Sequence, residues 1–217
     1  MHQNAIHHHR CKALVCAFLS ALMGSPIAVQ AQTSLSGGII LEDFDQELLG
    51  SPLGLKLQLN MTPSRGLEAF AAMSYSSGSF HDVGSTCVGL VFPDQDCAHE
   101  TRDNDSHAAL LSSGVRVSLG GWKQVGLAVI PAVGFGTVGS RQTGERTGRE
   151  RSAGKAVYAL LLAGELRMSL MPRLWLATGA SVGRMAPLSE DRVVDGYAPF
   201  EDPFTVRRYY VQIGRKW

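Results

Sequence analysis

The stretch Leu55-Lys56-Leu57-Gln58-Leu59-Asn60-Met61 has an apolar residue at every odd position and a polar residue at every even one. Such alternation places the two kinds of side chain on opposite faces of a β-strand, whereas a helix would spread both around its circumference. Ala159 to Ala163 alone would also fit a helix, and we assign it to a strand from its context. Eight runs of strand character follow one another along the chain, at 34–44, 55–61, 67–75, 107–119, 124–138, 155–170, 174–185 and 204–217.

The connections between these runs alternate in length. Short turns at 63–66, 120–123 and 171–173 alternate with long polar segments at 45–53, 78–106, 139–154 and 186–203. Short turns at one end and long loops at the other are typical of transmembrane barrels. We therefore predict an all-β fold, an eight-stranded antiparallel up-and-down transmembrane barrel with four surface loops and both termini in the periplasm.

The two faces of the predicted strands differ in polarity, and this difference indicates which face contacts lipid. One phase carries large apolar residues such as Leu57, Leu162 and Val211, and the other carries charges among Ser, Gly and Ala. A soluble core could not hold these charges without a large desolvation cost, so the apolar phase should face lipid and the polar phase the lumen. The predicted lumen charges are Glu42, Lys56, Arg208, Glu68, Arg116, Glu165, Arg167 and Lys216.

Pairing is expected within this set, because an unpartnered charge in a narrow interior is costly. We expect Glu42 to lie between Lys56 and Arg208, and the other five charges to meet nearer the short turns. Trp122, Trp175 and Trp217 lie near the short turns and predict an interfacial aromatic girdle, although Trp175 falls in the lumen phase. Pro131, in mid-strand, removes a ladder donor and predicts a bulge.

The chain has 217 residues, of which 45% are hydrophobic and 18% charged, with a formal net charge of +1. This composition excludes a disordered chain, and the charge does not indicate a nucleic-acid partner. Arg10 and Lys12 precede an apolar run at 13–23 and small residues before Gln32, which is typical of a signal peptide for Sec-type export. We predict a signal peptide at 1–31 and a barrel domain at 32–217; a retained N-terminal anchor is the alternative.

Two cysteines, Cys87 and Cys97, remain after this cleavage. An even pair in an exported protein predicts a disulfide. A zinc site would need more ligands than these cysteines and His99 supply, and neither a metal nor a cofactor is predicted.

The C-terminal residues Tyr209-Tyr210-Val211-Gln212-Ile213-Gly214-Arg215-Lys216-Trp217 end in an aromatic residue after alternating apolar positions. Together with the export signal and the strand–turn pattern, they resemble the small eight-stranded outer-membrane barrels of the OmpA transmembrane domain and OmpX type. The resemblance covers 34–217, with Arg215 as a departure at an expected apolar position. It implies a monomer in the bacterial outer membrane, recognised by the barrel assembly machinery through its last strand.

The family includes structural barrels, adhesins, narrow channels, small-molecule transporters and a few lipid-A-modifying enzymes. We expect a structural or cell-surface interaction role with a plugged lumen; the alternatives are a narrow channel or transporter and, less favoured, a lipid-modifying enzyme. The segment Ser79-Phe80-His81-Asp82 offers a hydroxyl, a base and an acid, but adjacent residues do not point together, so we predict no enzyme. The expected partners are membrane lipids and lipopolysaccharide, whose phosphates could contact Arg141, Arg146, Arg149 and Arg151; solvated loops that attract the acidic loops are the simpler interpretation.

Overall fold

A computed structural model describes residues 32–46, 49–64, 66–87, 97–145, 148, 150–188 and 203–217. The predicted signal peptide lies outside these residues and stays a prediction. Gln32–Trp217 forms one compact unit. None of the described residues belongs to a helix long and apolar enough to cross a membrane.

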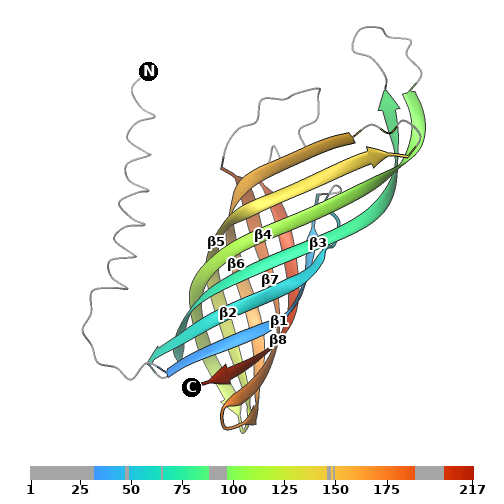
Figure 1. The fold of residues 1–217 in the computed structure, drawn as a ribbon. Helices are drawn as coiled ribbons and strands as arrows, with labels where there is room; N and C mark the ends of the chain where they lie inside the picture. The colour runs from blue at the N-terminus through green and yellow to red at the C-terminus, as the bar shows by residue number, and fades with distance from the viewer. Residues whose placement is uncertain are drawn as a thin grey trace, which may run out of the picture. The chain divides into compact units, whose positions relative to one another are not determined.

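Eight antiparallel strands follow one another around a closed barrel, and β1 pairs with β8 to complete the ring (Figure 1). Each strand pairs with its neighbour in sequence, so the topology is up-and-down, and the predicted fold is confirmed. The strands are β1 (Gln32–Phe44), β2 (Leu53–Ser64), β3 (Leu67–Cys87), β4 (Cys97–Trp122), β5 (Val125–Gly144), β6 (Glu150–Met171), β7 (Leu174–Pro187) and β8 (Phe204–Lys216).

Side chains alternate between the outer wall and the lumen along every strand. In β2, Leu55, Leu57 and Leu59 are exposed on the outer wall, whereas Gln58 and Asn60 are buried in the lumen. The outer wall is apolar on all eight strands, which is the opposite of a water-soluble barrel. This wall requires lipid around it, and the closed ring satisfies the backbone groups that lipid cannot.

Strands β3 to β6 are longer than the other four and extend past them at the end of the barrel that carries the long connections (Figure 1). The predicted loop 78–106 is therefore largely a hairpin, because β3 and β4 pair as far as Cys87 and Cys97. The predicted loop 139–154 is also mostly strand, with β5 and β6 paired as far as Thr143 and Glu150. Polar residues on both faces of a strand mark the point where the strand leaves the membrane. They do not mark the end of strand pairing, because the two strands of a hairpin still hydrogen-bond to each other.

The predicted bulge at Pro131 is wrong. The β4–β5 ladder runs from Gly114–Ala132 to Val117–Val129 without a change of register. Pro131 faces outward, so its missing N–H removes ladder bonds without inserting a residue. The register shifts lie beside the short turns instead, in the β2–β3, β4–β5 and β6–β7 pairs.

Candidate functional site

A buried ion pair joins the first and last strands of the barrel. Glu42 in β1 lies directly opposite Arg208 in β8, and the two side chains form a hydrogen-bonded ion pair. The Ser76 hydroxyl also donates to Glu42, and Arg208 Nη2 donates to Ser74 Oγ at 3.2 Å. Both charged side chains are almost completely buried, so the pair holds the closing seam of the barrel from inside.

The second cation predicted beside Glu42 lies elsewhere. Lys56 is opposite Gly38 in the β1–β2 register, deeper in the lumen than Glu42, whose amide instead donates to the carbonyl of Pro52. The Lys56 ammonium lies 4.1 Å from the ring centroid of Tyr210. The depth of Lys56 predicted from its distance to the strand end is wrong, because neighbouring strands of a tilted barrel are staggered.

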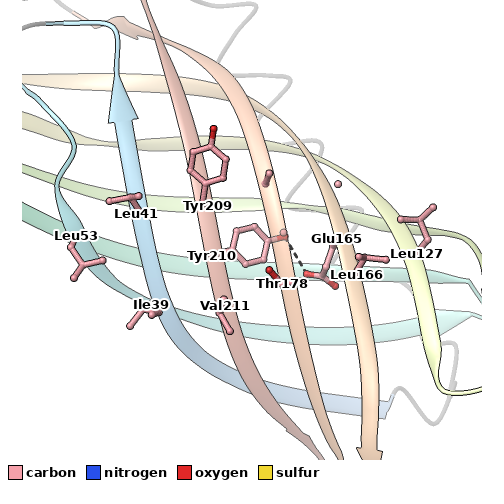
Figure 2. A pocket seen from close by; sticks show the side chains of 13 residues that line it. Ile39, Leu41, Leu53, Leu127, Glu165, Leu166, Thr178, Tyr209, Tyr210 and Val211 are labelled. Carbon is pink, nitrogen blue, oxygen red and sulfur yellow. Dashed lines mark hydrogen bonds between the residues drawn. The ribbon is translucent and has the colours of Figure 1, made fainter.

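Glu165 of β6 is the centre of a second group of lumen charges. Its Oε1 accepts hydrogen bonds from Arg116 Nε at 2.8 Å and Arg167 Nε at 3.2 Å. Its Oε2 accepts from the Tyr210 hydroxyl and from Gln212 Nε2, both at 3.2 Å. Figure 2 shows Tyr210 and Glu165 reaching toward each other from β8 and β6. Four donors from three strands thus compensate one fully buried carboxylate.

Glu68 of β3 completes this group. Arg167 Nη1 donates to both of its carboxylate oxygens, at 3.1 and 2.8 Å, and Arg116 Nη1 lies 3.7 Å away. Two glutamates therefore balance two arginines in one network across the lumen. We call Glu68, Arg116, Glu165 and Arg167 the charged layer.

Trp175 packs against the charged layer from within the lumen. It is only 1% exposed, and the Arg167 guanidinium lies 4.0 Å from its ring centroid. The prediction that Trp175 belongs to the membrane-facing girdle is therefore wrong: the odd positions of β7 face inward. Trp122 and Trp217 are 76% and 62% exposed, which suits a position at the membrane interface.

Lys216 is not part of the predicted network either. Among the described residues it forms no ion pair, and it lines a polar cavity of about 400 Å³ at the short-turn end. Glu68, Arg116, Lys123 and Arg167 line the same cavity, so this mouth of the barrel has more cations than acids.

An apolar layer fills the lumen at the opposite, long-connection end. The Phe44 and Phe204 rings meet edge to face, with centroids 6.1 Å apart. Leu49, from the connection between β1 and β2, is fully buried there. We define the apolar layer by its buried members Phe44, Leu49, Ala108, Leu110, Val138, Val157, Ala159, Met185, Phe204 and Val206.

This layer was not predicted from the sequence, because most lumen-phase residues are small or polar and the apolar ones are scattered over several strands. Bulky apolar residues in that phase, such as Phe44, Phe204 and Val206 at the outer strand ends, were the available signal. A cavity of about 40 Å³ lies in the lumen beside Lys56 and Arg208. It has room for a few water molecules.

A hollow also lies on the outer wall rather than in the lumen (Figure 2). It has a volume of about 510 Å³ and is lined mainly by lipid-facing side chains such as Leu41, Leu127 and Tyr209. Gly164 and Ala180 leave the depression between these larger residues. It belongs to the membrane-contacting surface and brings no polar groups together beyond the Tyr210–Glu165 pair behind it.

Arg141, one of the remaining predicted residues, lies in the extension beyond the barrel rim. Arg141 donates to both oxygens of Glu150 at 2.7 Å, and this hydrogen bonding raises the pKa of Arg141 above its ordinary value. Arg146, Arg149 and the Arg151 side chain lie outside the described residues. The backbones of Cys87 and Cys97 lie directly opposite each other, while their side chains are not among those described.

The triad considered for Ser79-Phe80-His81-Asp82 is not assembled. His81 Nδ1 lies 2.5 Å from Asp103 Oδ1 of the neighbouring strand. Asp82 instead accepts from the amide of Val83 at 2.7 Å. Neighbouring residues of a strand point to opposite faces, which separates His81 from Asp82.

No family model matches this chain, and no curated protein sequence does. Among solved structures, Ail, the attachment invasion locus protein of Yersinia pestis in complex with the heparin analogue sucrose octasulfate, shares 13% identity with a TM-score of 0.54, over 87% of this chain and all (100%) of that one. A major outer membrane protein from Thermus thermophilus shares 14% identity with a TM-score of 0.56, over 85% of this chain and 99% of that one.

These similarities concern the fold, and the lipid-facing wall agrees with them. The chain has the fold of the eight-stranded outer-membrane β-barrels. The resemblance to the small barrels of the OmpA and OmpX type is confirmed at the level of fold.

Proposed function

We propose that this protein is a sealed outer-membrane barrel with a structural or cell-surface interaction role. The observation that supports this proposal is the filled lumen, which holds the apolar layer, the charged layer and a cavity of about 40 Å³. A solute would have to displace Leu49 and the phenylalanines and then separate Glu165 from its four donors. Breaking a buried ion pair costs about 3–5 kcal/mol, so a spontaneous path is rare.

Single-channel recording of the refolded protein in planar bilayers tests the sealed lumen. We expect no steady conductance steps from the unaltered protein, with a general porin in the same membrane as the positive control. Leu49→Ala combined with Arg167→Ala removes bulk from both layers and should produce steps. Stable ohmic steps from the unaltered protein would reject a sealed barrel.

A narrow channel is the second candidate, and the short-turn mouth is the observation that favours it. Cations outnumber acids in the cavity of about 400 Å³, where Lys123 and Lys216 add to the balanced charged layer. A lumen that opened there would attract anions. Under a salt gradient, this candidate predicts an anion-selective reversal potential, whereas a sealed barrel gives no measurable current.

We assign the proposed surface role to the extension, which is the part of β3 to β6 that reaches past the other four strands. The β2–β3 ladder ends at Leu53–Ser77, so the described part of β3 beyond Ser77 pairs with β4 alone. Arg141 already donates hydrogen bonds to Glu150. We therefore propose that the arginines contacting lipopolysaccharide phosphates are Arg146, Arg149 and Arg151. Changing these three to Gln should weaken lipopolysaccharide binding, whereas changing Arg173 to Gln, in a short turn, should not.

We propose that the protein has no catalytic activity. The separation of His81 from Asp82, which face opposite sides of β3, supports this view. Lipid A from cells with and without the protein should give identical mass spectra. A mass difference that depends on the protein would contradict the proposal.

A further inference from the structure

Three side chains with metal-binding atoms converge on the extension beyond the barrel rim. His81 of β3 lies directly opposite Asp103 of β4. Glu145 follows β5, and its amide donates to the carbonyl of Thr101 at 3.0 Å, which holds it beside the other two. One ligand-type atom from each of the three residues lies within 4.8 Å of the others. Two carboxylates and an imidazole thus come from β3, β4 and the turn directly after β5.

Asp103 and His81 contact each other within this cluster. The Asp103 side chain is 50% exposed and that of His81 is 75% exposed, although Asp103 Oδ1 itself is covered and accepts no hydrogen bond among the described residues. His81 Nδ1 lies 2.5 Å from Asp103 Oδ1, in ion-pair contact. A cation bound beside these two side chains would take a lone pair from each of them.

We propose that His81, Asp103 and Glu145 bind a divalent transition-metal ion of the Zn²⁺ type. A neutral imidazole nitrogen with two carboxylates is a ligand set for zinc, and three protein ligands leave a position for water. Two ligands on one tetrahedral zinc lie about 3.3 Å apart, given bonds of about 2.0–2.1 Å. The observed atoms span from 2.5 Å to 4.8 Å, so small side-chain rotations bring them to this spacing.

The metal would tie together β3, β4 and the end of β5, where these strands have left the membrane. In this part of the extension, β3 pairs with β4 alone among the described residues. Zinc should therefore protect the extension from proteolysis. A hard cation such as Ca²⁺ prefers six to eight oxygen ligands, which His81 and two carboxylates do not supply.

The test measures zinc bound per barrel after the purified protein in phospholipid nanodiscs is equilibrated with Zn²⁺. Asp103→Asn is compared with the unaltered protein and with Asp82→Asn, a control beside His81 whose carboxylate faces the other side. The difference between variants is the readout, so any contribution from the tract His7-His8-His9 cancels. We expect Asp103→Asn to lose one zinc per barrel and Asp82→Asn to lose none.

NMR spectroscopy and a comparison with Ca²⁺ provide two further tests. Zinc should shift the His81 imidazole NMR resonances in the unaltered protein and in Asp82→Asn, but not in Asp103→Asn, with circular dichroism confirming that each variant is folded. Equal zinc content in all three proteins would overturn the proposal and leave a simple His81–Asp103 ion pair. Binding of Ca²⁺ in preference to Zn²⁺ would overturn the assignment to a transition metal.

Discussion

Glu42 and Asp43 are neighbours in β1 whose carboxylates lie in opposite environments. Glu42 faces the lumen and pairs with buried Arg208, whereas Asp43 faces outward, 3.6 Å from Arg207, with side chains that are 40% and 64% exposed. We expect Glu42→Ala to lower the free energy of unfolding in lipid vesicles by about 3 kcal/mol, since it leaves Arg208 buried without its carboxylate. Asp43→Ala should cost at most about 1 kcal/mol.

Both free energies come from urea titrations of the refolded barrel. Equal losses for the two variants would show that Arg208 finds water or another partner, and would contradict a dry closing seam between β1 and β8.

Gly179 provides a second test at the level of single residues. It lies opposite Tyr210 in the β7–β8 register, and an added Cβ would overlap the Tyr210 ring and hydroxyl. Gly179→Ala should therefore displace Tyr210, remove its hydrogen bond to Glu165 and lower the unfolding free energy by about 1–3 kcal/mol. Gly164→Ala is the matched control, because nothing lies within 4 Å of a Cβ added there.

Near-ultraviolet circular dichroism and urea unfolding report the two effects together. A Gly179→Ala barrel that unfolds like Gly164→Ala would show that the Tyr210 ring does not need the space above Gly179.

Among whole elements, the hairpin of β3 and β4 carries a prediction that remains untested. Cys87 and Cys97 are opposite each other in the ladder, and Cα atoms so placed in antiparallel strands are about 4.5–5.5 Å apart, within the range of disulfides. We expect no free thiols in the unreduced, unfolded protein isolated from outer membranes. After reduction, two thiols should react. Labelling of two cysteines without reduction would exclude the disulfide.

Strand prediction from the sequence succeeded where a strand separates two environments. In β2 and β8, lipid on one side and the lumen on the other impose strict alternation, so both were recognisable. In the outer parts of β3 and β4 both faces carry polar residues, so residues such as Ser79, Asp82 and Asp105 show no alternation of apolar and polar positions. Backbone hydrogen bonds hold the two strands together there, and these bonds require no particular pattern of side-chain polarity.

For the barrel as a whole, the sequence predicted which charges face inward but not how they pair. The inward direction follows from period two, so Glu42, Glu165 and Arg208 were placed correctly on the lumen side. Pairing depends on register and strand stagger, which brought Tyr210 rather than Glu42 to Lys56. The apolar layer was missed for a related reason, since its residues come from the outer ends of several strands and form a group only when the ring closes.

Sidedness in the membrane is the last prediction, and it concerns the whole molecule. The β3–β6 extension is polar on both faces, whereas the opposite end has short turns that include exposed Lys123 and Arg173. Outer-membrane barrels have short turns on the periplasmic side and longer loops outside, so we expect the extension on the cell surface. Trypsin added to intact cells should cut at Arg146 or Arg149, between β5 and β6.

The same intact cells should leave Lys123 unmodified by an amine reagent too large for porins, because its turn would face the periplasm. Lysis should make Lys123 reactive, which shows that the reagent can reach the turn when the membrane is open. Labelling of Lys123 on intact cells, with cleavage at Arg146 or Arg149 only after lysis, would reverse the orientation. The proposed metal site would then face the periplasm, and the surface role assigned to the extension would fall with it.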